Sequence, residues 1–420
     1  MKSSAAILFL VFFCLSSIAS AASKQSIELI DATELSYFHY PAKGKQVYIW
    51  LAPEAGLQLS EKKMAQQLAK QGIEVWYPDL FETNFLPIVA SSVEQFPAEQ
   101  IKALISAANT GKDIYLVASG RAVIPMLKGL RQWQIDMPNN TAIKGLILIS
   151  PKFFVETPDP GQEAKILPIV HATNIPVYLL QPAQSPWRWK LDKTLPALQQ
   201  GGSDVFLQIL PNVRDRFYYR PDAVAAEHQL AVQLPMFIKR ASKVLATLPA
   251  KRKAAILREN IKQQITNSKK DRVLTPYSDK PASPPLQLQD LSGKMVNIED
   301  YKGQVVMVNF WASWCPPCVY EMPSMQRLQD GLKNKPFHIL AVNMAEEKLT
   351  IERFLKEKVN VDFTIMLDSD GAALKRWKVF AFPTTYFIDK QGRLRYGLFG
   401  GREWDKPDVE KVIEALMNEK

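Results

Sequence analysis

The chain has 420 residues, of which 47% are hydrophobic and 10% aromatic, and its formal net charge is +10. This length exceeds one typical domain and suits two or three, each able to bury its own core. The composition is that of an ordinary globular protein, and no stretch beyond the N-terminus is long enough to span a membrane.

The first 21 residues have the layout of a secretory signal peptide. Lys2 precedes an unbroken apolar run from Ala5 to Leu15, and small residues follow up to Ala21. An uncleaved membrane anchor is the alternative, but this run is shorter than the roughly 20 residues that cross a bilayer. We therefore expect an exported protein in a bacterial periplasm, from which cleavage removes Cys14.

Residues 23–248 alternate short β-like runs with helix-like segments, which predicts an α/β domain with a parallel sheet. The runs are VYIWL, IEVWYP, DIYLVA, KGLILIS, IPVYLL and DVFLQIL, and the helical segments include Glu61 to Gln71 and Ala98 to Ala108. The pattern resembles an α/β-hydrolase, with IYLVASGRAVIPMLKGL in the place of the strand, elbow and helix that carry the nucleophile.

The resemblance lacks the chemistry of a hydrolase. Gly120 occupies the nucleophile position, and the loops QPAQSPW and PNVRDRF supply neither the acid nor the histidine. Because a hydrolase needs all three groups together, we expect a non-catalytic domain that binds a partner. The alternative is a shifted register with Ser119 as nucleophile and His228 as base, in an exported esterase with a redox accessory domain. The SPWRWK segment, residues 185–190, is either a partner-facing loop or a lid remnant.

Residues 249–285 differ in composition from both flanks. The run KRKAAILRENIKQQITNSKKDR has eight basic and two acidic residues, and Leu257, Ile261 and Ile265 recur every four positions, which predicts an amphipathic basic helix. DKPASPP then indicates a stiff Pro-rich linker. The basic run could bind anionic lipid or an acidic partner, or be a solvated linker. Nucleic acid is disfavoured because export separates the protein from it.

Two of the three cysteines lie in NFWASWCPPCVYEMP, residues 309–323. A β-like run leads directly into a helix, so Cys315 lies at a helix N-terminus, where N–H groups and the dipole stabilise a thiolate. Cys318 follows about one turn later and is shielded beneath it. This arrangement favours thiol–disulfide exchange, with no cofactor. A zinc site, for which His338 is the one nearby further ligand, and an inert staple are the alternatives.

The segment 286–420 resembles the TlpA/ResA-like thioredoxin-fold proteins, periplasmic thiol–disulfide oxidoreductases that include the reductants of cytochrome c maturation. LQDLSGKMVNIEDYKGQVVMVNFWASWCPPC is similar to the family's entry hairpin and active-site strand, and EMPSMQRL to its first helix. FTIMLDSDGAALKRWKVFAFPTTYFIDKQGRL resembles its inserted strand and helix and its cis-proline loop. The predicted helices of this segment are Val319 to Gly331, Thr350 to Lys358, Ala372 to Trp377 and Pro407 to Met417.

The resemblance implies a role for five residues. Cys315 is the nucleophile, Cys318 the resolving thiol, and Trp314 packs beside them. Pro383 is the cis proline that faces the disulfide. Glu321 handles protons in many family members, and its alternative interpretation is a solvated glutamate that favours the helix dipole.

One position departs from the pattern of cytosolic thioredoxins. They place a buried aspartate in the strand before the motif, where this chain has Asn309. The usual proton acceptor is absent, which increases the weight of Glu321.

The function expected from these features is that of a periplasmic thiol–disulfide reductase. Its partners are protein disulfides or thiols, and the family resemblance adds cytochrome c maturation and a membrane DsbD-like electron donor. A disulfide oxidase or isomerase is the alternative, because couples of this fold extend from about −270 mV to about −120 mV.

Overall fold

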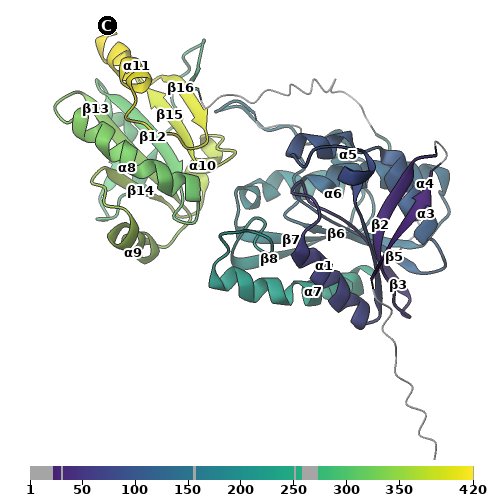
Figure 1. Ribbon diagram of the computed structural model, residues 1–420. Helices are drawn as coiled ribbons and strands as arrows, with labels where there is room; N and C mark the ends of the chain where they lie inside the picture. The colour runs from purple at the N-terminus through teal and green to yellow at the C-terminus, as the bar shows by residue number, and fades with distance from the viewer. Residues whose placement is uncertain (1–21, 30–31, 155–157, 250–251, 258–272, 420) are drawn as a thin grey trace, which may run out of the picture.

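The computed structural model describes residues 22–29, 32–154, 158–249, 252–257 and 273–419, which form two domains with a sheet each (Figure 1). The predicted signal peptide and most of the basic run lie outside these residues. Among the helices of the described ranges, none has the length and apolarity that a membrane crossing requires.

The N-terminal domain is built on an eight-stranded sheet in the order β1-β2-β4-β3-β5-β6-β7-β8. β1 pairs with β2 and β2 with β4 in antiparallel fashion, and all other neighbours are parallel, which confirms the predicted parallel sheet. The strands are β1 (Ser23–Glu28), β2 (Glu34–Tyr40), β3 (Gln46–Leu51), β4 (Ile73–Pro78), β5 (Asp113–Ser119), β6 (Ile143–Ile149), β7 (Val177–Gln184) and β8 (Val205–Arg214).

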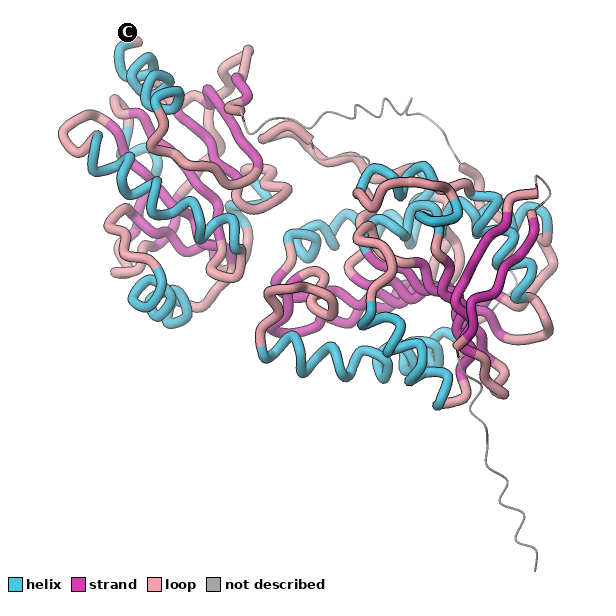
Figure 2. The backbone as a smooth tube through the Cα atoms, viewed as in Figure 1, coloured by secondary structure: helices cyan, strands magenta, loops and turns pink. Residues whose placement is uncertain are grey.

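Helices cover both faces of this sheet (Figures 1 and 2). Alternate residues of β3 enter opposite cores, because successive side chains of a strand point to opposite faces. Val47 and Ile49 pack with α3, α4, α5 and α6, whereas Tyr48 and Trp50 pack with α1 and α7. The helices are α1 (Leu59–Lys70), α2 (Leu80–Thr83), α3 (Ala98–Ala108), α4 (Val123–Asp136), α5 (Pro168–His171), α6 (Leu191–Gly201) and α7 (Ala225–Leu245), with short 3-10 turns η1 (Ala90–Gln95), η2 (Gly120–Ala122) and η3 (Pro186–Lys190).

The C-terminal domain has a six-stranded mixed sheet in the order β14-β13-β12-β15-β16-β9. The central strand β12 is parallel to β13 and antiparallel to β15, and β15 and β16 form the predicted hairpin. Its strands are β9 (Thr275–Pro276), β12 (Val305–Trp311), β13 (Phe337–Met344), β14 (Thr364–Asp368), β15 (Thr384–Ile388) and β16 (Leu394–Phe399), and β10 (Gln287–Gln289) and β11 (Met295–Asn297) form a separate hairpin.

The two faces of this second sheet are covered differently. Val305, Met307 and Trp311 of β12 pack on the side of α8 and α11, and Val306 and Val308 pack on the side of α10. Asn309 shares the α8 side and is fully buried there. The helices are α8 (Pro316–Gly331), α9 (Lys348–Lys358), α10 (Ala372–Arg376) and α11 (Pro407–Asn418), with the 3-10 turn η4 (Ile298–Tyr301).

The segment between the domains differs from the expectation at both ends. Residues 252–257 run as irregular chain against the N-terminal domain, where Arg252 donates to the backbone oxygens of Asn174 and Gly202. Helix is therefore absent from this described part of the basic run. At the other end, Thr275–Pro276 form β9 at the edge of the C-terminal sheet, and the Pro-rich stretch after it bonds to the β15–β16 turn.

Candidate active site

Cys315 and Cys318 form a disulfide at the start of α8. Cys315 is the N-cap of this helix, two prolines occupy its first turn, and the Cys318 N–H donates to the Cys315 sulfur at 3.3 Å. Proline suits the first turn because its missing N–H would have no partner there. The sulfur at position 315 thus lies where the helix dipole favours negative charge.

The two sulfur-bearing residues differ less in exposure than the sequence suggested. Cys315 is 5% exposed and Cys318 1% exposed, so both belong to the apolar cluster under α8. The expected open position of Cys315 is not seen in this oxidised form. Trp314 and Phe382 pack against the same cluster.

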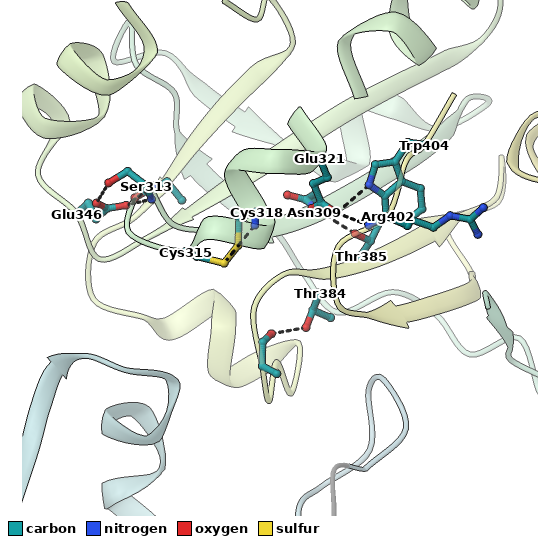
Figure 3. Close-up of a disulfide and its surroundings, with 12 residues drawn as sticks. Asn309, Ser313, Cys315, Cys318, Glu321, Glu346, Thr384, Thr385, Arg402 and Trp404 are labelled. Carbon is teal, nitrogen blue, oxygen red and sulfur yellow. Dashed lines mark hydrogen bonds between the residues drawn. A yellow bond between two sulfur atoms is a disulfide. The ribbon is translucent and has the colours of Figure 1, made fainter. Parts of the chain in front are cut away.

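A polar contact fixes the loop that leads into the disulfide. Glu346, just after β13, accepts hydrogen bonds from the Ser313 N–H at 2.7 Å and from the Asn343 side chain at 2.8 Å. The Ser313 hydroxyl donates to the same carboxylate. This holds the chain between β12 and α8 in one conformation (Figure 3).

Glu321 lies one helical turn after Cys318 and is fully buried. Its carboxylate accepts hydrogen bonds from the Asn309 side chain at 2.7 Å, from the Trp404 ring N–H at 3.0 Å and from the Arg402 backbone N–H at 3.3 Å. Figure 3 shows these groups gathered on one side of the disulfide. The interpretation of Glu321 as a solvated surface residue is therefore wrong, because its side chain has no contact with solvent.

The loop before β15 closes the opposite side of the site. The Phe382–Pro383 peptide bond is cis, and the Phe382 ring meets the Trp314 ring edge to face at 5.7 Å. The Pro383 carbonyl accepts from the Gly400 N–H at 2.9 Å. Gly401 approaches the Pro317 carbonyl so closely that an added Cβ would lie 2.7 Å from it, which requires a small residue there.

This arrangement suits two-electron thiol–disulfide chemistry. A dithiol at a helix N-terminus can form and break a disulfide, and a buried carboxyl one turn away can exchange a proton with the inner thiol. His338 lies on β13 against the Tyr301 ring. Within the described ranges, histidine, cysteine and carboxylate side chains form no group of three that could hold a metal.

The carboxyl ends of the N-terminal strands carry a second set of buried polar residues. Gly120, which the hydrolase resemblance aligns with a nucleophile, has φ of +56°, and a Cβ added to it would lie 2.3 Å from a Glu54 carboxylate oxygen. Glu54 accepts from the Arg121 N–H at 3.1 Å and pairs with Lys152. Burial opposes its ionisation, yet Lys152 and the Arg121 N–H lower the pKa of Glu54 to about 2. The space beside Gly120 is thus filled by the Glu54 carboxylate.

Ser119 and His228, the alternative nucleophile and base, are not brought together by any hydrogen bond of the described residues. Ser119 is buried and accepts from the Tyr218 hydroxyl at 2.9 Å, whereas His228 is exposed on α7. The Tyr218 oxygen also lies 3.1 Å from a Glu61 carboxyl oxygen, within hydrogen-bond distance. Burial raises the pKa of Glu61 to about 8, so this carboxyl is mostly neutral at pH 7.

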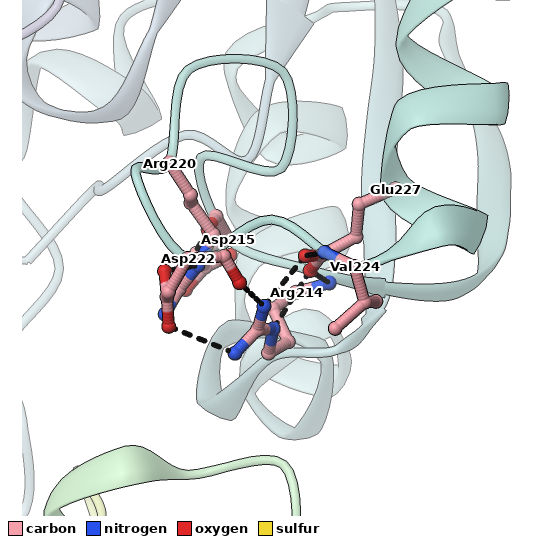
Figure 4. Close-up of polar contacts among 6 residues, drawn as sticks. All are labelled: Arg214, Asp215, Arg220, Asp222, Val224 and Glu227. Atoms are coloured by element: carbon pink, nitrogen blue, oxygen red, sulfur yellow. Dashed lines mark hydrogen bonds and ion pairs between the residues drawn. The ribbon is translucent and has the colours of Figure 1, made fainter.

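The loop after β8, where a hydrolase would place its histidine, is fixed by an ion-pair network (Figure 4). The Arg214 guanidinium donates to the Glu227 carboxylate at 2.6 and 2.7 Å, to the Asp222 carboxylate at 3.2 Å and to the Asp222 carbonyl at 2.8 Å. Glu227 also accepts from the backbone N–H groups of Arg214 and Val224. β8 extends to Arg214, so PNVR is strand and the loop begins at residue 215. This loop still contains no histidine.

The C-terminal fold and its disulfide define a thiol–disulfide oxidoreductase. Residues 278–413 match the family model described as Redoxin. The ResA thiol-disulfide oxidoreductase of Geobacillus kaustophilus is 37% identical over 134 residues, which are 32% of this chain and 75% of the relative. The ResA of Bacillus subtilis is 35% identical over 136 residues, 32% of this chain and 72% of that relative.

The chain therefore belongs to the Redoxin family, through a C-terminal domain similar to the ResA oxidoreductases. Among solved structures, StoA from Bacillus subtilis is 28% identical, with 32% of this chain and 98% of StoA covered and a TM-score of 0.28. The resemblance proposed for residues 286–420 is confirmed. The hydrolase resemblance of the N-terminal domain is not tested by these matches and stays a prediction.

Proposed function

We propose that this protein is an exported reductase of protein disulfides in a bacterial periplasm, and that it serves cytochrome c maturation. The observation that carries the proposal is the Cys315–Cys318 disulfide at the start of α8, with a buried glutamate one turn behind it. The resemblance of residues 286–420 to a family that includes reductants favours electron flow towards the substrate.

The reaction takes two exchange steps. In the reduced protein, the Cys315 thiolate attacks a substrate disulfide, forms a mixed disulfide and releases one substrate sulfur, which takes up a proton. Cys318 then attacks the Cys315 sulfur and releases the second substrate thiol. The substrate gains two electrons and two protons, and the protein ends as the disulfide.

Glu321 is the proposed proton acceptor for Cys318. A thiol must lose its proton before it attacks, and a buried thiol has no water to take it. Asn309, Trp404 and Arg402 hold the carboxylate by hydrogen bonds at fixed positions. The mature chain is then reduced again by a membrane thiol donor of the DsbD-like kind.

The N-terminal domain is proposed to be a non-catalytic, hydrolase-like partner-binding domain. The Glu54 carboxylate at the elbow and the absence of a histidine in the loop after β8 support this role. Esterase activity would require the elbow to be vacated, because a carboxylate there repels the oxyanion of an acyl-transfer transition state.

Trapping of the mixed disulfide tests the proposal. Cys318→Ala removes the thiol that resolves the intermediate, so the full chain in the periplasm should accumulate covalent complexes with its substrates on non-reducing gels. Cys315→Ala is the matched control and should give none. Apocytochromes among the trapped proteins would support cytochrome c maturation, and a broad set of secreted proteins would replace it with general reduction.

The direction of electron flow is decided by the reduction potential. A value near that of thioredoxin, about −270 mV, supports a reductase, whereas one near that of DsbA, about −120 mV, makes the protein an oxidase. Absence of any trapped complex contradicts the exchange mechanism.

A further inference from the structure

Two loops at the carboxyl edge of the N-terminal sheet reach the C-terminal domain. One follows β6 and contains Phe154 and Pro160, and the other is η3, which follows β7. In open α/β sheets this edge is where ligands bind. Here its loops carry aromatic side chains that contact the other domain.

Three aromatic rings form the centre of this contact. Trp187 stacks on Phe154 at 5.9 Å, and both meet the Phe380 ring edge to face, at 5.1 and 5.6 Å. Phe154 and Phe380 are 5% and 4% exposed, so the cluster is shielded from water. Edge-to-face pairs at these separations add to the free energy gained from burial alone.

Trp189 extends the contact to α10. Its ring lies over Gly371, where an added Cβ would be 2.5 Å from the ring, and it packs against the core cluster on the α10 side of the C-terminal sheet. Asp192 pairs with Lys375 beside it at 3.1 Å. The SPWRWK segment thus lies on a surface of the chain's own second domain.

The β6 loop makes a separate contact with the same domain. The Gly161 N–H donates to the Tyr386 hydroxyl at 3.2 Å, and Tyr277 donates to the Pro160 carbonyl. Pro160 also lies against Gly397 of β16, where an added Cβ would be 2.5 Å away.

These contacts hold both ends of one short segment of the redox site. Phe380 and Tyr386 bracket the chain that carries Phe382, and the Phe382 ring lies against Trp314, next to Cys315. A shift of this segment would therefore move one wall of the site. Misplacement of about 1 Å can lower a rate by about a hundredfold.

We propose that Phe154, Trp187 and Trp189 form an interdomain clasp that positions residues 380–386 beside the disulfide for protein substrates. The proposal rests on the thiol–disulfide exchange of the proposed function and holds in either direction of electron flow. Trp187 is a positioning residue, because it reaches the site through Phe380, and Trp189 holds the second domain at Gly371.

The test compares the full chain with the double variant Trp187→Ala, Trp189→Ala, using insulin as protein disulfide and oxidised glutathione as small disulfide. The variant should exchange with insulin about tenfold more slowly, while its rate with glutathione stays within about twofold, because only the large substrate uses the positioned wall. Small-angle scattering should show a larger radius of gyration. Phe85→Ala, which removes a 95% exposed aromatic ring of the N-terminal domain, is the control and should change none of these.

Three results overturn the clasp. If the double variant has a larger radius of gyration but unchanged exchange rates, the contact joins the domains without positioning the site. If its radius of gyration is unchanged, the two tryptophans do not hold the domains together. An equal loss on both disulfides means that the redox site itself is damaged. Failure of the unmodified chain to exchange with either disulfide contradicts the proposed function instead, which separates the two failures.

Discussion

Glu321 brings a carboxyl group into an apolar interior and receives three hydrogen bonds there. Glu321→Gln keeps one oxygen that can accept from Trp404 and Arg402, and the Asn309 amide can turn its own oxygen towards the new NH2 group, so we expect the fold to persist. The substitution removes the group that can take a proton, so the rate of exchange should change its dependence on pH. Single-turnover rates measured across neutral pH test this.

Glu403→Gln is the matched control, because Glu403 is a neighbouring glutamate that pairs with Lys406 on the surface. Its pH profile should equal that of the unmodified protein. A profile for Glu321→Gln that also equals it would remove Glu321 from the proton pathway.

The sequence identified Glu321 only through a family resemblance, and it did not reveal what holds it. Asn309 was noted as a missing aspartate, whereas the structure makes it a hydrogen-bond donor to that glutamate. Trp404 and Arg402 lie about 80 residues away in the chain and reach Glu321 because β16 ends beside α8. Spacing rules cover neighbours along a helix or strand and carry no information on such contacts.

Glu61 predicts a pH dependence of stability for the N-terminal domain. Its pKa is raised to about 8 in the folded chain, from 4.5 for the exposed group. Between pH 4.5 and 8 the folded state therefore keeps a proton on Glu61 that the unfolded state has lost. The stabilisation from Glu61 is full below pH 4.5 and is lost as the pH rises through 8. Each unit of pKa difference corresponds to about 1.4 kcal/mol.

Glu61→Gln should remove this loss, because the amide stays neutral. Between acidic and mildly alkaline pH, the urea midpoint of the unmodified domain should fall more than that of the variant. Glu34→Gln, at an exposed strand position, is the control and should follow the unmodified protein. Equal slopes for all three proteins would show that Glu61 is ionised in the folded state.

At the scale of elements, α3 and α4 approach each other closely at Gly129. A Cβ on Gly129 would lie 2.3 Å from the Cβ of Ile101 and 2.8 Å from the Ala98 carbonyl. At Gly331, the last residue of α8, a Cβ would meet no atom within 4 Å apart from its chain neighbours and the backbone of its own helix. Both glycines thus have a helical backbone, but an added Cβ would clash at Gly129 and would meet open space at Gly331.

Alanine should have opposite effects at these two positions. Gly129→Ala should destabilise the N-terminal domain by about 1–3 kcal/mol, because overpacking outweighs the gain in helix propensity. Gly331→Ala should be neutral or stabilise by up to about 1 kcal/mol. Amide hydrogen exchange in α4 and α8 measures the two effects separately. A Gly129→Ala protein that is more stable than the unmodified protein would contradict the close packing of α3 and α4.

Strands with a clear apolar run were predicted at the centre and at the edge of a sheet, including the edge strands β8 and β14, whereas strands without such a run were not. The helix predicted at Ala98 to Ala108 has these bounds in the structure, and the helix predicted at Val319 begins at Pro316. β1, β2 and β9 were not predicted, because SKQSIE and TP have almost no apolar residues and ELSYFHY has no continuous apolar run. An edge strand is defined by the partner beside it, which the local sequence does not show.

At the scale of the whole molecule, the C-terminal domain begins before its predicted boundary at residue 286. The Tyr277 and Ser283 N–H groups donate to Arg395 and Gly392, and Leu274 is buried under the sheet. Proline occurs both in extended linkers and in strands at a sheet edge. A Pro-rich sequence therefore does not show whether the segment is a free linker or packs on the edge of a sheet. Composition alone therefore cannot place this boundary.

Two fragments test the boundary. The fragment 273–420 should be more stable than 286–420 by roughly 2–4 kcal/mol, since the shorter one loses several backbone hydrogen bonds worth about 1 kcal/mol each. Urea unfolding of both measures the difference. Equal midpoints would show that residues 273–285 only lie on the domain without stabilising it.

The covalent connection between the domains lowers the affinity that the clasp needs in order to hold them together. Leu257 packs on the N-terminal domain and Thr275 pairs with the C-terminal sheet, so the two anchored points are 18 positions apart in the sequence. A chain of this length reaches at most about 50–60 Å. Linked partners within such a radius meet at millimolar effective concentration. A contact too weak to join two separate proteins can therefore hold these two linked domains together.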